Sequence, residues 1–142
     1  MPSIPLISPA GYAPKFAIAF GNATGGADTV QPDNPLPVTF APAAAPAALT
    51  GSAASSTTVG PFAPAAGRAI VLVLSGTWTG QVQLLRSVDG GATKLPVTAG
   101  GQAYGLYTQN VCEPVWEEAE AAATLYLGIT VTTGTVSYRM GQ

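Results

Sequence analysis

Four of the seven acidic residues stand in one short stretch of the chain, and paired carboxylates are the groups that glycoside hydrolases use. The four are Glu113, Glu117, Glu118 and Glu120. Glu117 and Glu118 are adjacent, so they point apart in either a helix or a strand. We therefore interpret the stretch as a solvated acidic edge, which could also hold a divalent ion weakly. A glycan hydrolase that uses these acids is a distant third alternative.

Nucleophilic catalysis lacks the residues that it usually needs. The sequence has no histidine, which removes the usual Ser–His, Cys–His and zinc–water arrangements. The single cysteine, Cys112, excludes an internal disulfide and gives no zinc spacing. Its apolar neighbours predict a small, buried core residue. The sequence therefore predicts a protein that is not an enzyme and that has no cofactor and no metal site.

The sharpest motif is Ser87-Val-Asp-Gly-Gly-Ala-Thr93. It matches the Ser-x-Asp-x-Gly-x-Thr core of the Asp-box that recurs in sialidases and other β-propellers. Asp89 can accept hydrogen bonds from backbone donors in its own turn, while Gly90 and Gly91 supply positive φ. The motif occurs once, and a propeller needs several blades. We therefore predict that Ser87, Asp89, Gly90, Gly91 and Thr93 stabilise a hairpin turn, with no catalytic or metal-binding role.

Composition limits the partners. Only 8% of the 142 residues are charged and the net charge is −2, so no basic surface for nucleic acid is expected. No apolar run approaches the length of a membrane span. The first residues lack the basic region of a signal peptide, which predicts synthesis in the cytoplasm. So few charges are typical of a surface that is buried in an assembly.

The composition changes near Gly67. Eleven of the thirteen prolines lie at or before Pro64. This predicts an extended Pro/Ala-rich arm and linker over residues 1–67, with a short strand at 15–20, a loop at 21–28 and polyproline II passing into β at 34–40. These segments are too short to bury their own apolar side chains, so we predict that they anchor the chain to a partner. The predicted anchor residues are Phe16, Ile18, Phe20, Leu36, Val38 and Phe40.

Residues 68–142 predict an all-β head domain, a small antiparallel β-sandwich of immunoglobulin-like or jelly-roll-like type. The apolar run 69–74 is a predicted strand, followed by a turn at 75–80 and a second strand at 81–86. Thr124 to Val131 predicts another strand, with a turn at 132–135 and a closing strand to Met140. Weaker strands are predicted at 95–98 and 104–107.

One segment of the head allows two interpretations. Residues 113–123 could form a helix, since Pro114 would stand at its first position and acids would crowd its N-terminal end. The alternative is a strand from Val111 to Glu117 that is followed by a turn. We favour the strand, because the sandwich needs it.

Three stretches carry a resemblance to a known family: Leu72-Val-Leu-Ser-Gly-Thr-Trp-Thr-Gly80, Gln83-Leu-Leu-Arg-Ser-Val-Asp-Gly-Gly-Ala-Thr93 and Gly134-Thr-Val-Ser-Tyr-Arg139. In this order they resemble small β-sandwich structural proteins of tailed bacteriophages and prophages. The resemblance covers about half of the chain and brings no catalytic residues. It implies a virion component, either a capsid decoration or head-fibre protein or a tail-associated module, whose partners are capsid or tail proteins.

We expect homo-oligomers, because many adjacent sites strengthen attachment through avidity. The alternative to capsid decoration is a module at the tail tip or on a fibre that binds host glycan. A surface cluster of two or more of its aromatic residues would favour this alternative, whereas burial of Trp78 and Trp116 would indicate a plain core. The candidate aromatic residues are Trp78, Tyr104, Tyr107 and Trp116.

Overall fold

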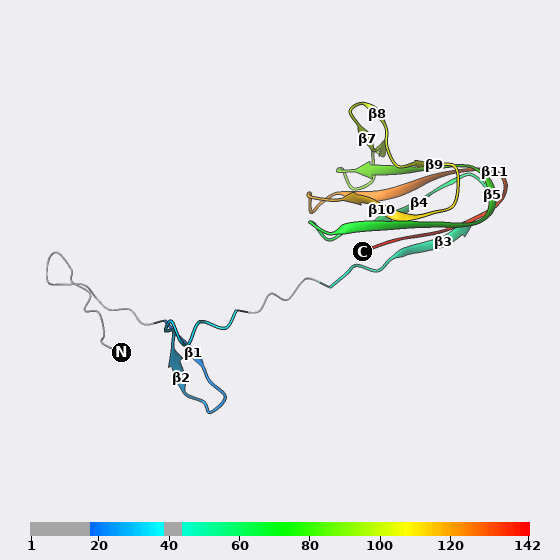
Figure 1. Ribbon diagram of the computed structural model, residues 1–142. Helices are drawn as coiled ribbons and strands as arrows, with labels where there is room; N and C mark the ends of the chain where they lie inside the picture. The colour runs from blue at the N-terminus through cyan, green and yellow to red at the C-terminus, as the bar shows by residue number, and fades with distance from the viewer. Residues whose placement is uncertain (1–17, 39–43) are drawn as a thin grey trace. The chain divides into compact units, whose positions relative to one another are not determined.

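The computed structural model describes residues 18–38 and 44–142 and divides the chain into two compact units, Met1–Pro42 and Ala43–Gln142 (Figure 1). Every regular element assigned to the described residues is a β-strand, so the fold is all-β, as the sequence predicts. Across these described ranges no helix is long and apolar enough to cross a membrane.

The first unit contains one β-hairpin. Strand β1 (Ala19–Gly21) pairs antiparallel with β2 (Ala27–Thr29). The side-chain oxygen of Asn22 accepts hydrogen bonds from the backbone N–H groups of Thr24 and Gly26, which closes the loop between the strands. The strand predicted at 15–20 therefore begins only at Ala19 among the described residues, and the predicted loop 21–28 is wrong at its end, where β2 begins.

Two long strands organise the second unit. Strand β5 (Ala69–Ser87) pairs antiparallel with β11 (Thr124–Gly141) from one end to the other, from Ser87 opposite Thr124 to Val71 opposite Gly141. The free side of β11 pairs with β3 (Leu49–Ala53) and β4 (Thr57–Phe62). The free side of β5 pairs with β10 (Val111–Glu117), β6 (Leu95–Pro96) and β9 (Leu106–Tyr107). Strands β7 (Thr98–Ala99) and β8 (Gln102–Ala103) form a separate small hairpin.

The ribbon formed by β5 and β11 doubles back on itself, as its turn at the right end of Figure 1 shows. The first half of β5 and the second half of β11 lie with β10 and β3, and their other halves lie with β4, β6 and β9. The result is an antiparallel β-sandwich whose two layers share both long strands. Its core joins side chains from both halves of the ribbon: Ile70, Leu72, Leu74, Val82, Leu84, Leu125, Leu127, Ile129, Val136 and Met140.

The turns predicted at 75–80 and 132–135 are wrong, because both strands continue through these segments. The chain does change direction in these segments, but it does so by a bend at glycine residues within the paired strands and not by turns between separate strands. Gly76, Gly80 and Gly134 have positive φ, and the register between β5 and β11 shifts between Val131 and Thr133. The ladder therefore bends at these glycines without ending.

The domain boundary predicted at residue 67 is also wrong. The second unit begins at Ala43, and β3 and β4 belong to the sandwich rather than to a linker. Ala53 and Phe62 are buried in its core. The prediction failed because the segment is rich in alanine, serine and glycine, so only a few of its side chains mark the face that packs inward.

Of the two interpretations of residues 113–123, the strand is confirmed, since β10 spans Val111–Glu117 with the predicted bounds. Pro114 stands on an edge strand, where the missing backbone donor is tolerated. Cys112 is exposed, so its predicted burial is wrong. On β10 the core-facing position is taken by Val115, next to a register shift between Pro114 and Trp116.

Replacing Gly134 by alanine tests the bend. Gly134 has a φ of +80°, and a Cβ atom there would lie 2.0 Å from the carbonyl oxygen of Thr77, so the paired strands would have to separate. We expect the free energy of unfolding of the full chain, measured in urea, to fall by about 3 kcal/mol.

Gly101→Ala is the matched control. Gly101 has nearly the same φ, +79°, but a Cβ atom there meets nothing within 4 Å. It should cost only about 1 kcal/mol, the penalty of the left-handed backbone alone. Equal losses in the two variants would contradict the close approach of the strands at the bend.

Candidate functional site

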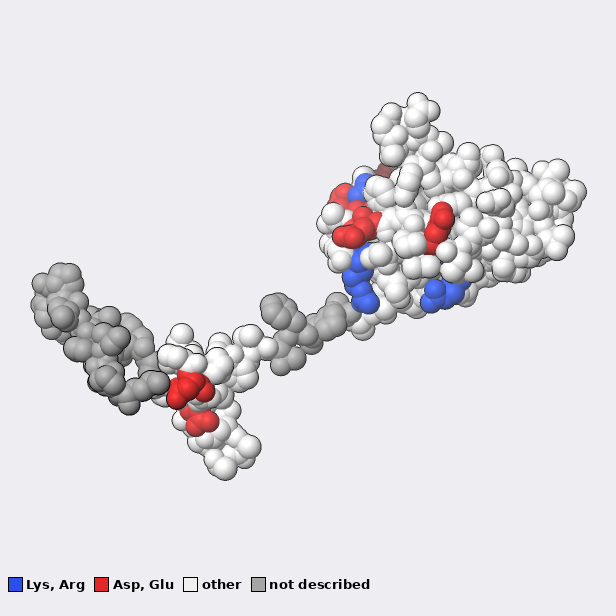
Figure 2. All heavy atoms as spheres, in the orientation of Figure 1, with Lys and Arg blue, Asp and Glu red and all other residues white. Residues whose placement is uncertain are grey.

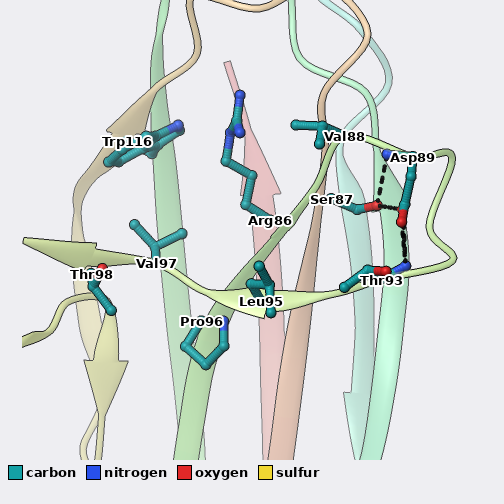
Figure 3. A pocket seen from close by; sticks show the side chains of 10 residues that line it. All are labelled: Arg86, Ser87, Val88, Asp89, Thr93, Leu95, Pro96, Val97, Thr98 and Trp116. Atoms are coloured by element: carbon teal, nitrogen blue, oxygen red, sulfur yellow. Dashed lines mark hydrogen bonds between the residues drawn. The ribbon is translucent and has the colours of Figure 1, made fainter. Parts of the chain in front are cut away.

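An open groove of about 510 Å³ lies between the end of β5, the turn that follows it, β6 and β10 (Figure 3). Its lining is mainly apolar, with Trp116 on one side and Leu95 and Pro96 on another. Asp89 and Thr93 lie at the far side from Trp116. An apolar hollow with a few polar groups at its margin is the usual form of a small-molecule site.

A partly buried ion pair lies beside this groove, with Glu118 buried and Arg86 28% exposed. Glu118 is 2% exposed. Both of its carboxylate oxygens accept hydrogen bonds from Arg86, at 2.8 Å from Nε and 2.9 Å from Nη2. Arg86 Nη2 also donates to Glu120 at 2.7 Å. The predicted solvated acidic edge is therefore wrong for Glu118, which is buried and paired, while Glu113, Glu117 and Glu120 are exposed.

The ion pair also fixes the position of an aromatic ring. Trp116 Nε1 donates a hydrogen bond of 3.2 Å to Glu118, and the backbone N–H groups of Ala119 and Glu120 donate to the other carboxylate oxygen. Glu118 therefore has partners for both oxygens, which a buried carboxylate requires. Since Trp116 lines the groove, the buried pair holds one wall of the groove in place.

Two carboxylates at and beside the groove, those of Asp89 and Glu118, have lowered pKa values. Hydrogen bonds from Arg86 lower the pKa of Glu118 to about 2, against the opposing effect of burial, and the same contacts raise the pKa of Arg86. Hydrogen bonds from Thr93 and Ser87 hold the pKa of Asp89 well below its ordinary range. A glycosidase needs one carboxyl group with a raised pKa as its general acid. Asp89 and Glu118 both have the opposite shift.

The turn at the end of β5 has the geometry expected from the sequence. Ser87 Oγ donates to Asp89 at 2.7 Å, and the backbone N–H of Thr93 donates to both Asp89 oxygens, at 2.9 and 3.0 Å. Gly90 and Gly91 have positive φ, and the N–H of Gly91 donates to Ser87 Oγ. The carboxylate of Asp89 is thus engaged by its own turn, which supports a structural role.

Two of the four candidate aromatic residues lie together. The rings of Tyr104 and Trp116 are 6.4 Å apart between centroids and tilted by 56°. Tyr104 is 42% exposed, and Trp116 is half-buried. The two rings form a partly exposed aromatic pair next to the groove, which is the arrangement that favours glycan binding over a plain core.

The other two aromatic residues have structural surroundings. Trp78 is half-buried against the core, and its Nε1 donates to Asn110 at 2.8 Å. Asn110 in turn donates to the carbonyl of Gly76, so it ties Trp78 to the bend of β5. Tyr107 is half-buried against the core, and burial raises its pKa to about 12. Neither residue lines the groove.

The predicted anchor residues lie in the first unit. Ile18, Leu36 and Val38 are exposed, and Phe20 is half-buried. Phe16 and Phe40 lie outside the described residues. Within residues 18–38 no side chain is buried, so the structure gives these apolar groups no core of their own.

Sequence reasoning missed the Arg86–Glu118 pair. The two residues are 32 positions apart. They meet because β10 pairs with the start of β5, and the folded ribbon brings the end of β5 back to the same end of the sandwich in the other layer. The signal that was present is the position of Glu118 directly after a strand. No group of acidic, cysteine and histidine residues that could hold a metal ion occurs in the described ranges.

Comparisons of the chain with protein families, with curated proteins and with solved structures gave no match.

The pH dependence of stability tests the buried pair. Because folding lowers the pKa of Glu118 from its ordinary 4.5 to about 2, its contribution is complete above pH 4.5 and is lost as the pH falls through 2. Urea denaturation at a series of pH values should show stability decreasing over this range. Asp89 adds to the decrease with the same sign.

Glu118→Gln should flatten part of this decrease and lower the stability at pH 7 by about 2 kcal/mol, because Arg86 loses its charged partner. Glu117→Gln is the control, since it removes an exposed carboxylate from the same stretch. If both variants kept the full pH dependence, Glu118 would not be its source.

Proposed function

We propose that the chain is a non-enzymatic structural protein of a bacteriophage virion, a capsid decoration or head-fibre protein anchored by its N-terminal part. The observation that carries this proposal is the first unit: it is folded into a hairpin, yet none of its described residues is buried. The apolar side chains that are exposed within residues 18–38 would gain stability from burial against a partner surface. The resemblance of the sequence to phage structural proteins implies that the partner is a capsid or tail protein.

The energetics favour contact along much of the first unit. Ile18, Leu36 and Val38 would each contribute about 1.5–3 kcal/mol if fully buried against a partner. Ordering the segment costs about 1–2 kcal/mol per residue, a cost that its prolines reduce by stiffening the free chain. The burial of only a few side chains is therefore too weak to anchor a single copy. Binding becomes stronger when several copies attach together. A homo-oligomeric virion protein satisfies this requirement.

Removal of residues 1–42 should abolish attachment while leaving the sandwich folded. The boundary follows the division at Pro42, so β3 and β4 stay with the second unit. Virions from the strain that encodes the chain should contain the full-length protein by mass spectrometry. Particles that lack it should take up the full chain and should not take up residues 43–142.

Residues 1–42 fused to an unrelated carrier should bind the same particles. This binding should change little with salt, because residues 1–42 contain only three charged side chains, Lys15, Asp28 and Asp33. If residues 43–142 decorate the particles and the fusion stays free, attachment belongs to the sandwich and the anchoring proposal is wrong.

Glycan binding at the groove is the second candidate function, and the Tyr104–Trp116 pair is the observation that favours it. A sugar ring could stack on an aromatic face, and Asp89 and Thr93 could bond its hydroxyl groups. In this case the protein would belong to a tail tip or fibre, and the groove would recognise the host surface.

A glycan array probed with the full chain tests this candidate. Any glycan bound at the groove should bind about tenfold more weakly to Tyr104→Ala, which corresponds to about 1.4 kcal/mol. Leu106→Ala is the control, because Leu106 is 43% exposed, close to the 42% of Tyr104, but offers no ring. Absence of any bound glycan, or equal losses in both variants, would exclude stacking on this pair.

A further inference from the structure

One edge of the sandwich carries no charge. Strands β3 and β4 both pair with the side of β11 that faces away from β5, so they lie on the same side of the second unit, each at the edge of one layer. Residues 43–67, which contain both strands, include no Asp, Glu, Lys or Arg. Figure 2 shows that the charged side chains visible on this face of the unit gather mainly toward one end, while the other end of the face is uncharged.

The opposite edge is protected against further pairing. Strand β10 carries Glu113, Pro114 and Glu117, all exposed, and a register shift before Trp116. Strands β6 and β9 have two residues each, and β6 contains Pro96. Charges, prolines, bulges and short strands are the features by which natural sheets prevent edge-to-edge association.

Strand β3 has none of these features. Its sequence is Leu49-Thr-Gly-Ser-Ala53, and its three central residues are exposed. In β4, by contrast, Pro61 removes one backbone donor. The unprotected part of the edge is therefore β3, which ends the strand order β10–β5–β11–β3.

We propose that β3 pairs antiparallel with β3 of a second copy of this chain, around a two-fold axis at Gly51. Because side chains alternate between the faces of a strand, this register places Leu49 opposite Ala53 on the core side. It places Thr50 opposite Ser52 on the outer face, a pairing of two hydroxyl side chains. The strand is thus complementary to itself in size and polarity, and it carries no charge of its own. Arg139 lies opposite Thr50 on the neighbouring strand β11.

The surroundings of Gly51 agree with an axis at this position. A Cβ atom on Gly51 would lie 2.4 Å from the hydroxyl oxygen of Tyr138, so the Tyr138 ring reaches the edge strand. Tyr138 is half-buried in the single copy. A second β3 strand would cover more of this ring, and the two sheets would continue as one across the axis.

This inference deepens the homo-oligomeric part of the proposed function by naming the surface that pairs. It is read out with the purified chain, so failure of particle binding and failure of β3 pairing are separate results. Sedimentation velocity of the full chain over a concentration series should show a dimer. The double variant Thr50→Lys/Ser52→Lys should shift the dimer midpoint at least tenfold toward the monomer, since lysines from both copies would then face each other across the axis.

Thr108→Lys/Gln109→Lys is the matched control, because it adds the same charge at two exposed loop residues away from this edge. It should keep the dimer. Circular dichroism and thermal unfolding verify that both variants retain the sandwich. A monomeric wild-type chain at every concentration, or equal dimerisation of the two variants, would overturn the proposal and assign any association to the first unit or to another surface.

Disulfide cross-linking tests the register. In a Cys112→Ser background, one chain carries Thr50→Cys and a second chain of different length carries Ser52→Cys. Directly opposite residues in an antiparallel pair lie about 4.5–5.5 Å apart between Cα atoms, within the range of a disulfide, whereas diagonal residues are about 7–8 Å apart. The mixture should therefore form the mixed disulfide faster than either chain forms its own. Equal rates, or no cross-link in any sample, would contradict pairing centred on Gly51.

Discussion

The antiparallel pairing of β5 with β11 is the interaction on which the rest of the second unit depends. Every other strand of its main sheet pairs with only one of these two: β3 and β4 with β11, and β6, β9 and β10 with β5. The core side chains of both layers also come largely from this ribbon. Since β5 and β11 are far apart in sequence, their pairing costs the conformational entropy of closing a long loop. The short strands can pair only after this ribbon has formed.

Glycine at the bend makes this pairing possible. A long two-stranded ribbon exposes one apolar face, and it can bury that face only by folding over. Gly80 and Gly134 let the two backbones approach within a distance that excludes any side chain, as the close contacts of a hypothetical Cβ atom indicate. The Asp89 turn and the groove lie at the end of β5 that this fold places beside β10, so the bend also positions the candidate site.

The sequence predicts the fold class well and the course of the chain less well. The apolar runs 69–74 and 124–131 and the strand Val111–Glu117 are found as strands, because their large side chains mark an inward face. Segments of small residues misled the prediction in two ways. Gly76 and Gly80 suggested a turn where a strand bends, and Ala/Ser-rich residues 49–62 suggested a linker where an edge strand runs. A glycine in the sequence is equally typical of a turn between two strands and of a bend within one strand. Which of the two forms depends on the pairing with the partner strand.

The candidate site shows a similar limit. The hydrogen bonds of the Asp89 turn are local, so the spacing of Ser87, Asp89 and Thr93 was sufficient to predict them. The burial of Glu118 depends on Arg86, which comes from another strand, and four acids in one stretch gave no indication of which one is paired. Exposure of Cys112 likewise follows from the register of β10 rather than from its neighbours in sequence.

Scarcity of charge connects the two proposals about assembly. About a quarter of the residues of a typical soluble domain are charged, and these charges keep it soluble. Charges on edge strands also prevent edge-to-edge association of sheets. In this chain Arg86 and Glu118 form a partly buried ion pair, and Glu118 also accepts a hydrogen bond from Trp116. The remaining charges leave β3 unprotected, and the apolar side chains Ile18, Leu36 and Val38 of the first unit are exposed. A β3 pair would join two first units in one particle-binding dimer, so each attachment would raise the local concentration of the other at the virion surface. Under the proposed function, the dimer then supplies the avidity that a single weakly anchored arm lacks.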